Sequence, residues 1–356
     1  MPKPVIVYTD LPWAIGADGS VDPSLATIER EIFGNNVELR FPASTGGHYN
    51  LKSQQFFDKL SGAAALIIYR CQVTKDLLDA AGSNLKVVGR QGVGFDNLAP
   101  DLLEARGIIG FNIPDYCVDE VVTHTMALLL ALERRVIPQH LSLSQGEFNI
   151  YAGGVPRRLS NRSVGIIGFG RIGRAVSVRL RFFYGNVMAY DPYVEADLMN
   201  AYGTAKVDLE TLLAESDAVL LHCLLNDETA GMLNTRAFAK MKPTTFLINC
   251  ARGALVDSSA LYAALSRGQI AGAGIDVFSP ENPHQDEWYA KIVKMENVVV
   301  TSHRAFLSEE SQVSQRRRAA EGVLHVLKTG RPPAVGHVTQ ALEYRDSRVL
   351  SRQNQV

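Results

Sequence analysis

The stretch Ser163-Val164-Gly165-Ile166-Ile167-Gly168-Phe169-Gly170-Arg171-Ile172-Gly173 decides the fold of this chain. Its first five residues are typical of a buried strand, and its last three glycines have the spacing Gly-x-Gly-x-x-Gly. A helix with Ala175, Val176 and Val178 on its apolar side follows. The glycine spacing alone is common, but here both flanking elements that it requires are present. The stretch therefore predicts the first strand, turn and helix of a dinucleotide-binding sheet.

Each glycine has a physical task in such a turn. Gly168 permits the turn, Gly170 lets a pyrophosphate approach bare backbone, and Gly173 lets the helix pack against the strand. The amides at the N-terminus of the helix then face the phosphate charge. We therefore expect this turn to hold the pyrophosphate of a dinucleotide.

Asp191 narrows the choice of cofactor. It stands eighteen residues after Gly173 and directly after a predicted strand, where a carboxylate can hold the ribose hydroxyls of adenosine. A phosphate on that ribose would face the carboxylate, and Pro192-Tyr193 supplies no arginine to neutralise it. The pattern predicts NAD as the cofactor. The alternative is a structural turn followed by an aspartate that caps a helix.

Short β-branched runs alternate with helical stretches on both sides of the glycine turn, which indicates parallel sheets. The first series predicts strands over residues 5–8, 37–41, 64–69 and 86–90. The second series predicts six strands, over residues 164–167, 187–190, 218–222, 245–249, 273–277 and 298–301. A chain of 356 residues exceeds the usual size of one hydrophobic core. We therefore expect an α/β fold of two Rossmann-like, doubly wound domains with parallel sheets.

The second domain is expected to interrupt the first. A helix expected over residues 305–327 has no strand left to serve in the second sheet, so it should return to the first domain. This predicts a discontinuous substrate-binding domain of residues 1–117 and 305–356 and an NAD-binding domain of residues 118–304. We expect the cleft between them to close over cofactor and substrate. The residues after about Gly336 are expected to be frayed.

The charge balance gives no sign of a polyanionic partner. The chain has 36 Lys and Arg against 37 Asp and Glu, so it lacks a global field for nucleic acid or an anionic membrane. The basic cluster Arg316-Arg317-Arg318 is expected to form a solvated helix face. The start of the chain lacks the apolar region of a secretory signal, and no apolar run approaches the roughly 20 residues that span a bilayer. We expect a cytoplasmic protein without a direct nucleic acid or membrane partner.

Cysteine and histidine spacing gives no sign of a metal site. The four cysteines are far apart, and none forms a Cys-x-x-Cys pair. The eight histidines include no His-x-x-x-His pair on a predicted helix. We therefore expect no metal, and reduced thiols at Cys71, Cys117, Cys223 and Cys250.

Polar residues follow three consecutive strands of the second series. Arg252 follows the strand ending at residue 249, Asp276 and Glu281 close or follow the next strand, and His303 follows the last. Open α/β sheets bind ligands beyond the carboxyl ends of their strands, so these side chains should face one crevice. Taken singly, each has an ordinary structural role as the alternative, in a surface ion pair or a solvated loop.

The types of these residues suit oxidation of a hydroxyl group to a carbonyl. Such a reaction needs a base for the hydroxyl proton, and histidine titrates in a suitable range. A carboxylate such as Glu281 would orient His303 and stabilise the charged imidazolium. The forked guanidinium of Arg252 can bind a substrate carboxylate and polarise the reacting carbonyl oxygen. An anionic 2-oxo acid fits this set of side chains.

At these residues the chain resembles the D-isomer-specific 2-hydroxyacid dehydrogenases, and the resemblance extends from about Pro4 to Pro333. It rests on the glycine turn and on four further ordered motifs. These are Gly-Val-Gly-Phe-Asp-Asn at 92–97, Asn-Cys-Ala-Arg-Gly-Ala-Leu-Val-Asp at 249–257, Asp-Val-Phe-Ser-Pro-Glu at 276–281 and Thr-Ser-His-Arg-Ala at 301–305.

The resemblance implies a role for each residue of these motifs. Arg252 would bind substrate, Glu281 would tune the histidine, and His303 would exchange a proton with the substrate oxygen. The amides near Val93 and Gly94 would hold the substrate carboxylate. A further set would contact the cofactor: Arg171 and Ile172 at the pyrophosphate, Asp276 at the nicotinamide carboxamide, and Cys223, Asn226, Cys250 and Ala251 elsewhere along it.

Within the family, the chain most resembles the C-terminal-binding protein co-repressors, through Gly-Phe-Asp-Asn at 94–97, Tyr-Asp-Pro-Tyr at 190–193 and Leu-His-Cys at 221–223 with Asn226. It departs from common family patterns at Ser302 and Asn282, where proline is usual. Phe306 stands where the co-repressors carry tryptophan. These departures put the fit of the substrate side chain in doubt.

Two hypotheses follow. The first is an NAD(H)-dependent oxidoreductase that interconverts a small 2-oxo acid and its D-2-hydroxy acid, with His303 as acid and base. The second is an NAD(H)-sensing dimeric scaffold of the co-repressor type with weak dehydrogenase activity. A homodimer is expected in both cases, through a helix from about Val118 to Arg135 whose apolar surface is broad. Arg70 and Arg90 either add positive charge for a second anionic group or form ion pairs.

Overall fold

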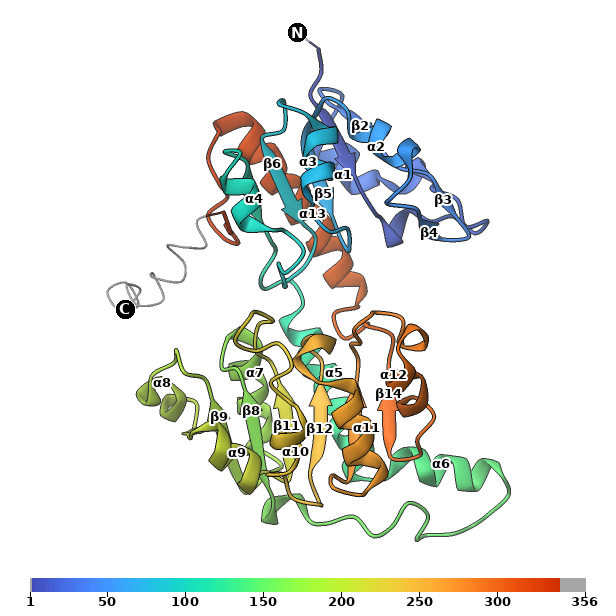
Figure 1. Ribbon diagram of the computed structural model, residues 1–356, viewed down its shortest axis with the longest axis vertical. Coiled ribbons are helices and arrows are strands. Elements are labelled where there is room, and N and C mark those ends of the chain that lie inside the picture. The colour runs from blue at the N-terminus through green and yellow to red at the C-terminus, as the bar shows by residue number, and fades with distance from the viewer. Residues whose placement is uncertain (1, 340–356) are drawn as a thin grey trace. The chain divides into compact units, whose positions relative to one another are not determined.

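The computed structural model describes residues 2–339. The chain divides into two compact units, one formed by the residues up to Tyr116 together with those from Glu309 on, the other by Cys117–Ser308 (Figure 1). The first unit is therefore discontinuous. The boundaries expected from the sequence were after residues 117 and 304.

The first unit is built on a five-stranded parallel sheet in the order β2-β1-β5-β6-β7. Its strands are β1 (Val5–Tyr8), β2 (Glu38–Arg40), β5 (Ala63–Ile68), β6 (Val87–Arg90) and β7 (Ile109–Phe111). The sequence predicted four of them and missed β7, which has only three residues with Gly110 at its centre. A short hairpin of β3 (Ser44–Thr45) and β4 (His48–Tyr49) was also missed.

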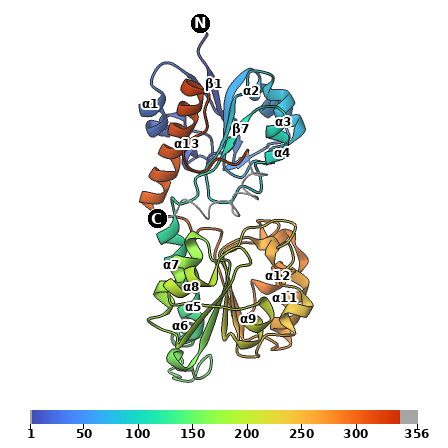
Figure 2. The ribbon, with the colours of Figure 1, turned by 90° about the vertical axis from the view of Figure 1, so that its left-hand side faces the viewer.

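Helices cover both faces of this sheet, as Figure 2 shows. Alternate residues of β5 point to opposite sides, as a strand requires: Leu66 and Ile68 pack in one core and Ala65 and Ile67 in the other. The helices are α1 (Thr27–Phe33), α2 (Gln54–Leu60), α3 (Lys75–Ala81), α4 (Pro100–Glu104) and α13 (Glu309–Thr329), with α1 and α13 on one face and the others on the opposite face.

The basic cluster on α13 attaches this returning helix to its unit. Arg316 binds both carboxylate oxygens of the buried Glu29 at 2.9 and 2.7 Å and stacks 3.7 Å over the Trp13 ring. Arg317 pairs with Glu31, and Arg318 pairs with Asp115. The expectation of a merely solvated helix face was therefore wrong, because each guanidinium meets a carboxylate of its own unit.

The chain stays packed for a short distance beyond Gly336. The Val338 amide donates to the Gly110 carbonyl at 2.9 Å, and His337 pairs with Phe111 of β7. The expectation of fraying directly after Gly336 was wrong for residues 337–339, because they cover the edge of the sheet. The same expectation for residues 340–356 falls outside the described residues.

The second unit has a seven-stranded parallel sheet in the order β10-β9-β8-β11-β12-β13-β14. Its strands are β8 (Ser163–Ile167), β9 (Asn186–Tyr190), β10 (Ala205–Lys206), β11 (Ala218–Leu221), β12 (Phe246–Asn249), β13 (Gly272–Ile275) and β14 (Val298–Val300). The prediction of six strands was one too few, because β10 has only two residues and leaves no periodic pattern. The strand order reverses between β8 and β11, and such a reversal opens a ligand crevice at the carboxyl ends of the strands.

Two helical layers enclose this sheet, with α5 to α8 on one side and α9, α11 and α12 on the other (Figure 2). The helices are α5 (Val118–Glu133), α6 (Val136–Ser144), α7 (Arg171–Leu180), α8 (Ala196–Ala201), α9 (Leu209–Glu215), α10 (Thr235–Phe238), α11 (Ser258–Ser266) and α12 (Glu287–Ile292). Within the described residues, no helix is long and apolar enough to cross a membrane, and no group of histidine, cysteine and acidic residues could hold a metal ion.

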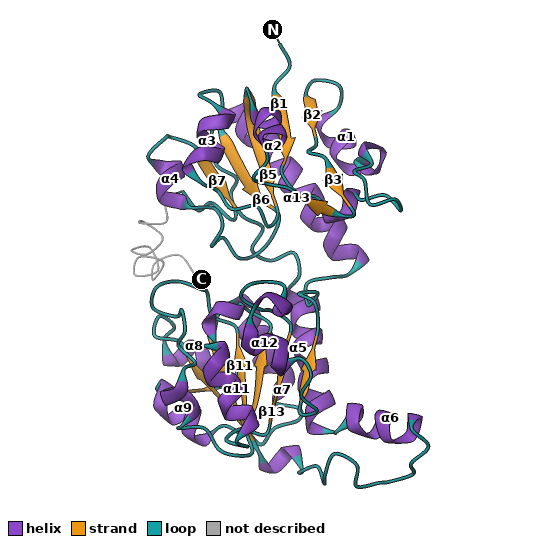
Figure 3. Ribbon diagram, turned by 45° about the vertical axis from the view of Figure 1, so that its right-hand side comes forward, coloured by secondary structure: helices purple, strands orange, loops and turns teal. Residues whose placement is uncertain are grey.

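The apolar surface of α5 serves the unit's own core. Val122, Leu129 and Leu132 are buried in the cluster that also contains residues of β8 and α7. The sequence analysis expected the broad apolar surface of this helix to contact a second subunit, and that reason was wrong because the surface is buried within the unit. Exposed apolar side chains gather instead on α6 and the segment after it, which stand away from the rest of the unit in Figure 3: Val136, Leu141, Leu143, Phe148, Ile150, Tyr151 and Val155.

A buried ion pair closes the amino end of this sheet. Arg162 Nη1 lies 2.7 Å from Glu133 Oε2, and the hydroxyl of Tyr184 donates to Glu133 Oε1 at 2.7 Å. Burial raises the pKa of the Glu133 carboxyl, which the hydrogen bond from Tyr184 and the charge of Arg162 oppose. Arg162 also donates to the carbonyls of Asp217 and Thr244, so it ties α5 to the loops that precede β11 and β12.

Candidate active site

The glycine turn has the geometry of a phosphate cradle. Gly168 has φ +94°, and a Cβ there would lie 2.5 Å from the Cys223 amide nitrogen. A Cβ on Gly173 would lie 2.1 Å from the Gly168 carbonyl oxygen, so that glycine is needed for close packing. A Cβ on Gly170 would meet no atom within 4 Å. The space beside Gly170 is therefore open, as the approach of a pyrophosphate requires.

The first amides of α7 complete this cradle. The helix begins at Arg171, and its N-cap, Gly170, provides no side chain to accept from the amides of the first turn. These donors and the helix dipole favour an anion at this point. The residues present thus fit the pyrophosphate of NAD.

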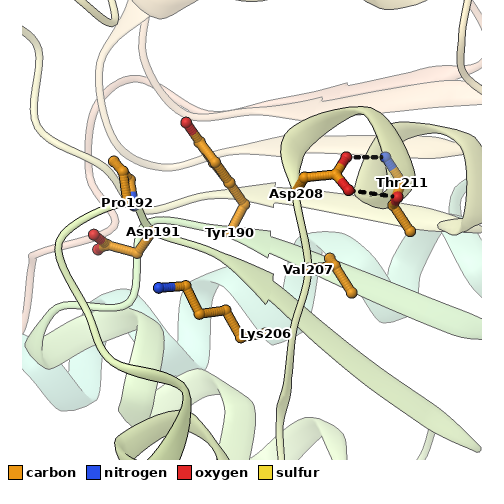
Figure 4. A pocket seen from close by; sticks show the side chains of 7 residues that line it. All are labelled: Tyr190, Asp191, Pro192, Lys206, Val207, Asp208 and Thr211. Carbon is orange, nitrogen blue, oxygen red and sulfur yellow. Dashed lines mark hydrogen bonds between the residues drawn. The ribbon is translucent and has the colours of Figure 1, made fainter.

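Asp191 lies directly after β9, beside the turn. Its Oδ2 accepts from the Phe169 amide at 2.8 Å and its Oδ1 from the Tyr193 amide at 3.0 Å. The carboxylate thus braces the glycine turn in addition to lining a groove (Figure 4). The sequence predicted only its contact with a ribose.

Lys206 lines the same groove and was not predicted. It pairs with Ala189 across β9 and β10, and Asp191 is two residues beyond Ala189, directly after the end of β9. Its Nζ donates to the Val194 carbonyl at 2.7 Å. Figure 4 shows the Lys206 side chain extending toward Asp191, whereas Asp208 turns away and caps α9 through Thr211. The sequence argument considered only Pro192 and Tyr193, the residues next to Asp191, and so it did not find the ammonium group of Lys206.

Four other predicted cofactor residues lie in the loops after β11 and β12. Cys223 packs against the glycine turn, and Asn226 organises its own loop by accepting from the Glu228 and Thr229 amides. The Ala251 amide donates to the Asn249 side chain at 3.0 Å. Burial raises the pKa of the Cys223 and Cys250 thiols to about 12, so both remain protonated at neutral pH.

His303 and Glu281 are in direct contact. Nδ1 of His303 lies 2.9 Å from both Oε1 and Oε2 of Glu281. An ionised carboxylate only accepts, so Nδ1 carries a proton and Nε2 is the ring nitrogen available for exchange. The edge of the Phe306 ring meets the imidazole, with ring centroids 6.2 Å apart. The structure therefore brings together His303, the predicted acid-base residue, and the carboxylate predicted to orient it.

Arg252 stands in the loop after β12, next to the strand that leads to Glu281. Its Nη1 donates to the Ala251 carbonyl at 2.8 Å, and its own carbonyl accepts from Asn249 Nδ2 at 2.9 Å. A Cβ on Gly253 would lie 2.1 Å from the Phe278 carbonyl carbon, so the Arg252 loop packs tightly on the segment that leads to Glu281. Arg252, Glu281 and His303 thus follow three neighbouring strands, β12, β13 and β14.

Asp276 is placed differently from a surface ligand. Its side chain is fully buried, and both carboxylate oxygens accept from the turn that carries His303. The sequence predicted only that Asp276 contacts the nicotinamide carboxamide of the cofactor. In the structure, Asp276 also accepts hydrogen bonds that hold the turn of His303. His124 of α5 lies 3.5 Å from the Asp276 carboxylate and was also missed, because 152 residues separate the two in the sequence.

The remaining predicted residues belong to the first unit. Val93 and Gly94 follow β6, where the Val93 carbonyl accepts from the Asn112 side chain. A Cβ on Gly92 would overlap the Arg90 guanidinium, so Gly92 makes room for that side chain. Arg70 lies 5.5 Å from the centre of the Tyr69 ring. Burial raises the pKa of Tyr69, and the charges of Arg70 and Arg90 oppose that rise.

Comparison with known proteins agrees with this geometry. Residues 126–305 match the family model described as D-isomer specific 2-hydroxyacid dehydrogenase, NAD binding domain. The chain belongs to this family, its second unit carries the NAD-binding domain, and its cofactor is NAD. Hydroxypyruvate reductase of Thermotoga maritima is 36% identical over 258 residues, which cover 72% of this chain and 81% of that protein.

Longer relatives and solved structures extend the comparison. D-3-phosphoglycerate dehydrogenase of Archaeoglobus fulgidus is 34% identical over 267 residues, 74% of this chain and 49% of that protein, so the chain matches about half the length of that relative. D-lactate dehydrogenase of Aquifex aeolicus, solved with NAD and lactic acid, is 26% identical with a TM-score of 0.79 over 92% of this chain and 96% of that one. The apo D-lactate dehydrogenase of Escherichia coli has a TM-score of 0.74 at 26% identity over 94% and 99%.

Proposed function

We propose that this chain is an NAD-dependent dehydrogenase that interconverts a small 2-oxo acid and the corresponding D-2-hydroxy acid. The observation that carries the proposal is the contact between His303 and Glu281, 2.9 Å apart, in the domain that holds the NAD turn. His303 is oriented by a carboxylate, and it follows β14, two strands away from β12, which leads to Arg252, the candidate clamp for a substrate carboxylate. This arrangement suits acid-base chemistry on a 2-oxo acid.

The proposed mechanism divides the work among three side chains. NADH, when bound, supplies the hydride that reaches the carbonyl carbon of the oxo acid. His303 holds a proton at Nε2 and gives it to the carbonyl oxygen, while Glu281 stabilises the charged ring through Nδ1. Arg252 binds the substrate carboxylate with some of its forked N–H donors and polarises the reacting carbonyl oxygen of the substrate with another. The amides near Val93 and Gly94, in the first unit, remain predicted substrate-binding groups.

The identity of the acid is a finer proposal. Arg70 and Arg90 lie at the carboxyl edge of β5 and β6, where a second anionic group of a substrate would find two positive charges. The alternative is that Arg70 and Arg90 form ion pairs and that the substrate is a monoanionic acid. Hydroxypyruvate and its 3-phosphate differ by one anionic group and therefore separate the two cases.

Steady-state consumption of NADH tests the proposal. The full chain is assayed with glyoxylate, pyruvate, hydroxypyruvate, phosphohydroxypyruvate and longer 2-oxo acids. We expect turnover with at least one acid and its loss, by at least 100-fold, in His303→Ala with NADH affinity retained. Absence of turnover with every acid would overturn the proposal. If phosphohydroxypyruvate is preferred, Arg90→Leu should remove that preference.

A homodimer remains a proposal, now through α6 and the segment after it. In this segment, 88% of the surface of Phe148 and 70% of the surface of Ile150 are exposed to solvent. Exposed apolar clusters of this kind favour a second copy as the partner. Light scattering of the wild type should give twice the mass of 38.9 kDa, and Phe148→Glu should weaken the association. Phe182, which is 85% exposed outside this segment, provides the control Phe182→Glu. A monomeric wild type would overturn the proposal.

The co-repressor-like scaffold remains a hypothesis that rests on the motifs at 94–97 and 190–193. The relatives described above have the names of enzymes and give it no support. The cytoplasmic location also stays a prediction.

A further inference from the structure

We propose that His124 is a positioning residue for His303 and that it acts through Thr301 and Asp276. The inference rests on the proposed function, because it concerns the same catalytic histidine. All four residues belong to the second unit: His124 lies on α5, Asp276 follows β13, and Thr301 and His303 follow β14.

Asp276 is the residue on which the turn carrying His303 is built. Its carbonyl accepts from the His303 amide at 2.7 Å. Its Oδ1 accepts from the Arg304 amide and its Oδ2 from the Ala305 amide, both at 2.9 Å. Three successive amides of the turn therefore bind one fully buried residue.

The backbone of His303 needs this support. Its φ of +53° lies in the left-handed region, which is strained for a residue other than glycine. Such a conformation persists only where the surroundings hold it. The direction of the imidazole therefore depends on the bonds that the turn makes to Asp276.

Asp276 is held in turn by Thr301 and His124. Thr301 Oγ1 lies 2.5 Å from Asp276 Oδ1 and 2.9 Å from His124 Nε2. The carboxylate only accepts, so the single hydroxyl proton of Thr301 goes to Asp276, and the Thr301 oxygen accepts from Nε2–H of His124. Burial lowers the pKa of His124 despite the charge of Asp276, which favours the neutral ring with its proton on Nε2.

The hydrogen bonds thus run in one direction, from α5 to the catalytic turn. Without the donor at His124, the Thr301 oxygen loses the hydrogen bond that orients its hydroxyl group toward Asp276. The turn of Gly168 to Gly173, which is expected to hold the pyrophosphate, joins β8 to α7 and takes no part in this network. Asp276, which is expected to contact the nicotinamide carboxamide, belongs to the network but is kept in the variants, and its Oδ2 still accepts from the Ala305 amide. Loss of His124 should therefore impair proton transfer more than NADH binding.

Two substitutions at one position separate positioning from bulk. His124→Leu keeps a similar volume and removes the donor, whereas His124→Gln returns an N–H group that can reach Thr301. We expect kcat to fall at least tenfold in His124→Leu and to recover most of that loss in His124→Gln. NADH affinity, measured by fluorescence, should stay within about threefold in both. Thr301→Val should lower kcat similarly, and the double variant should lose no more than either single variant.

A measurement without substrate keeps this test separate from the proposed function. In protein with ¹³C-labelled histidine, the His303 ring signal is assigned with His303→Gln and followed at fixed pH. We expect it to shift or broaden in His124→Leu and Thr301→Val and to stay in place in His124→Gln. If the wild type turns over no acid, the proposed function fails while this signal still reports on positioning. An unmoved His303 signal in a folded His124→Leu or Thr301→Val variant would overturn the inference.

Discussion

Nδ1 of His303 lies 2.9 Å from each carboxylate oxygen of Glu281. The two residues come from loops after neighbouring strands, so the sheet itself sets their separation. Both carboxylate oxygens are equally near, so either of them can accept the hydrogen bond from Nδ1–H and orient the ring. The contact defines which ring nitrogen is left for chemistry.

Glu281→Gln tests the charge of this carboxylate. The amide keeps the size of the side chain and an acceptor oxygen for Nδ1–H but no longer stabilises the imidazolium. We expect kcat for reduction of the oxo acid to fall about 10- to 100-fold, because the carboxylate no longer stabilises the charged ring that gives the proton. Steady-state measurement of kcat and of NADH affinity checks this. A variant with the wild-type kcat would contradict the proposed role of Glu281.

Gly170 and Gly173 provide a matched pair for the cofactor turn. A side chain on Gly170 enters open space, so Gly170→Val should fold with an unchanged melting temperature and bind NADH at least tenfold more weakly. A Cβ on Gly173 would lie 2.1 Å from the Gly168 carbonyl oxygen, so Gly173→Ala should lose about 1–3 kcal/mol of stability. Calorimetry and fluorescence titration of both variants measure the two effects. Equal NADH affinity in Gly170→Val and wild type would show that the pyrophosphate lies elsewhere.

Asp191 and Lys206 together should set the preference for NADH over NADPH. Asp191→Asn removes the charge that repels a ribose phosphate and should narrow the preference by about tenfold. Adding Lys206→Met should weaken NADPH several-fold and NADH little, because only the phosphate needs the ammonium group. Both cofactors are titrated into the wild type, Asp191→Asn, Lys206→Met and the double variant, and the affinities show whether each residue acts on the ribose phosphate. If Lys206→Met weakens both cofactors equally, the lysine serves only to hold the loop at Val194.

The pair of Arg162 and Glu133 should be essential for stability because it is buried. Arg162→Met leaves the Glu133 carboxylate without its ion-pair partner and should cost about 3–5 kcal/mol. Arg162→Met combined with Glu133→Leu should cost less than Arg162→Met alone, since no charge is then stranded. Lys75→Ala at the exposed pair with Asp79 is the control and should cost less than about 1 kcal/mol. Urea unfolding measures all three variants.

His222 should make folding sensitive to acid. Its Nε2 is buried without a hydrogen-bond partner, and burial lowers the pKa of His222 to about 4. The folded pKa is below that of the unfolded chain, near 6.5, so the unfolded state binds the proton more tightly and stability falls as pH drops from 6.5 toward 4. Between about pH 7.5 and pH 5 this amounts to about 2 kcal/mol. Urea unfolding of His222→Gln at both pH values should show a pH dependence smaller by that amount, and an equal dependence would rule out this origin.

The class of fold and the candidate residues of the site could both be predicted from the amino-acid sequence alone. The glycine spacing at 168–173 needs a strand and a helix within the same short stretch, so neighbouring residues contain the whole signal. Arg252, Glu281 and His303 were predicted because each directly follows a strand, and parallel strands end at the same edge. Their grouping therefore follows from strand order alone.

Features that depend on partners far apart in the sequence could be found only in the folded chain. The two-residue strand β10 exists because β9 offers it an edge, and it brings Lys206 to the groove of Asp191. The burial of α5 depends on the sheet that covers its apolar face. His124 reaches Asp276 from a helix far away in the sequence, and a hydrogen bond between such residues leaves no periodic pattern. Local patterns specify elements and motifs, whereas packing decides which side chains meet.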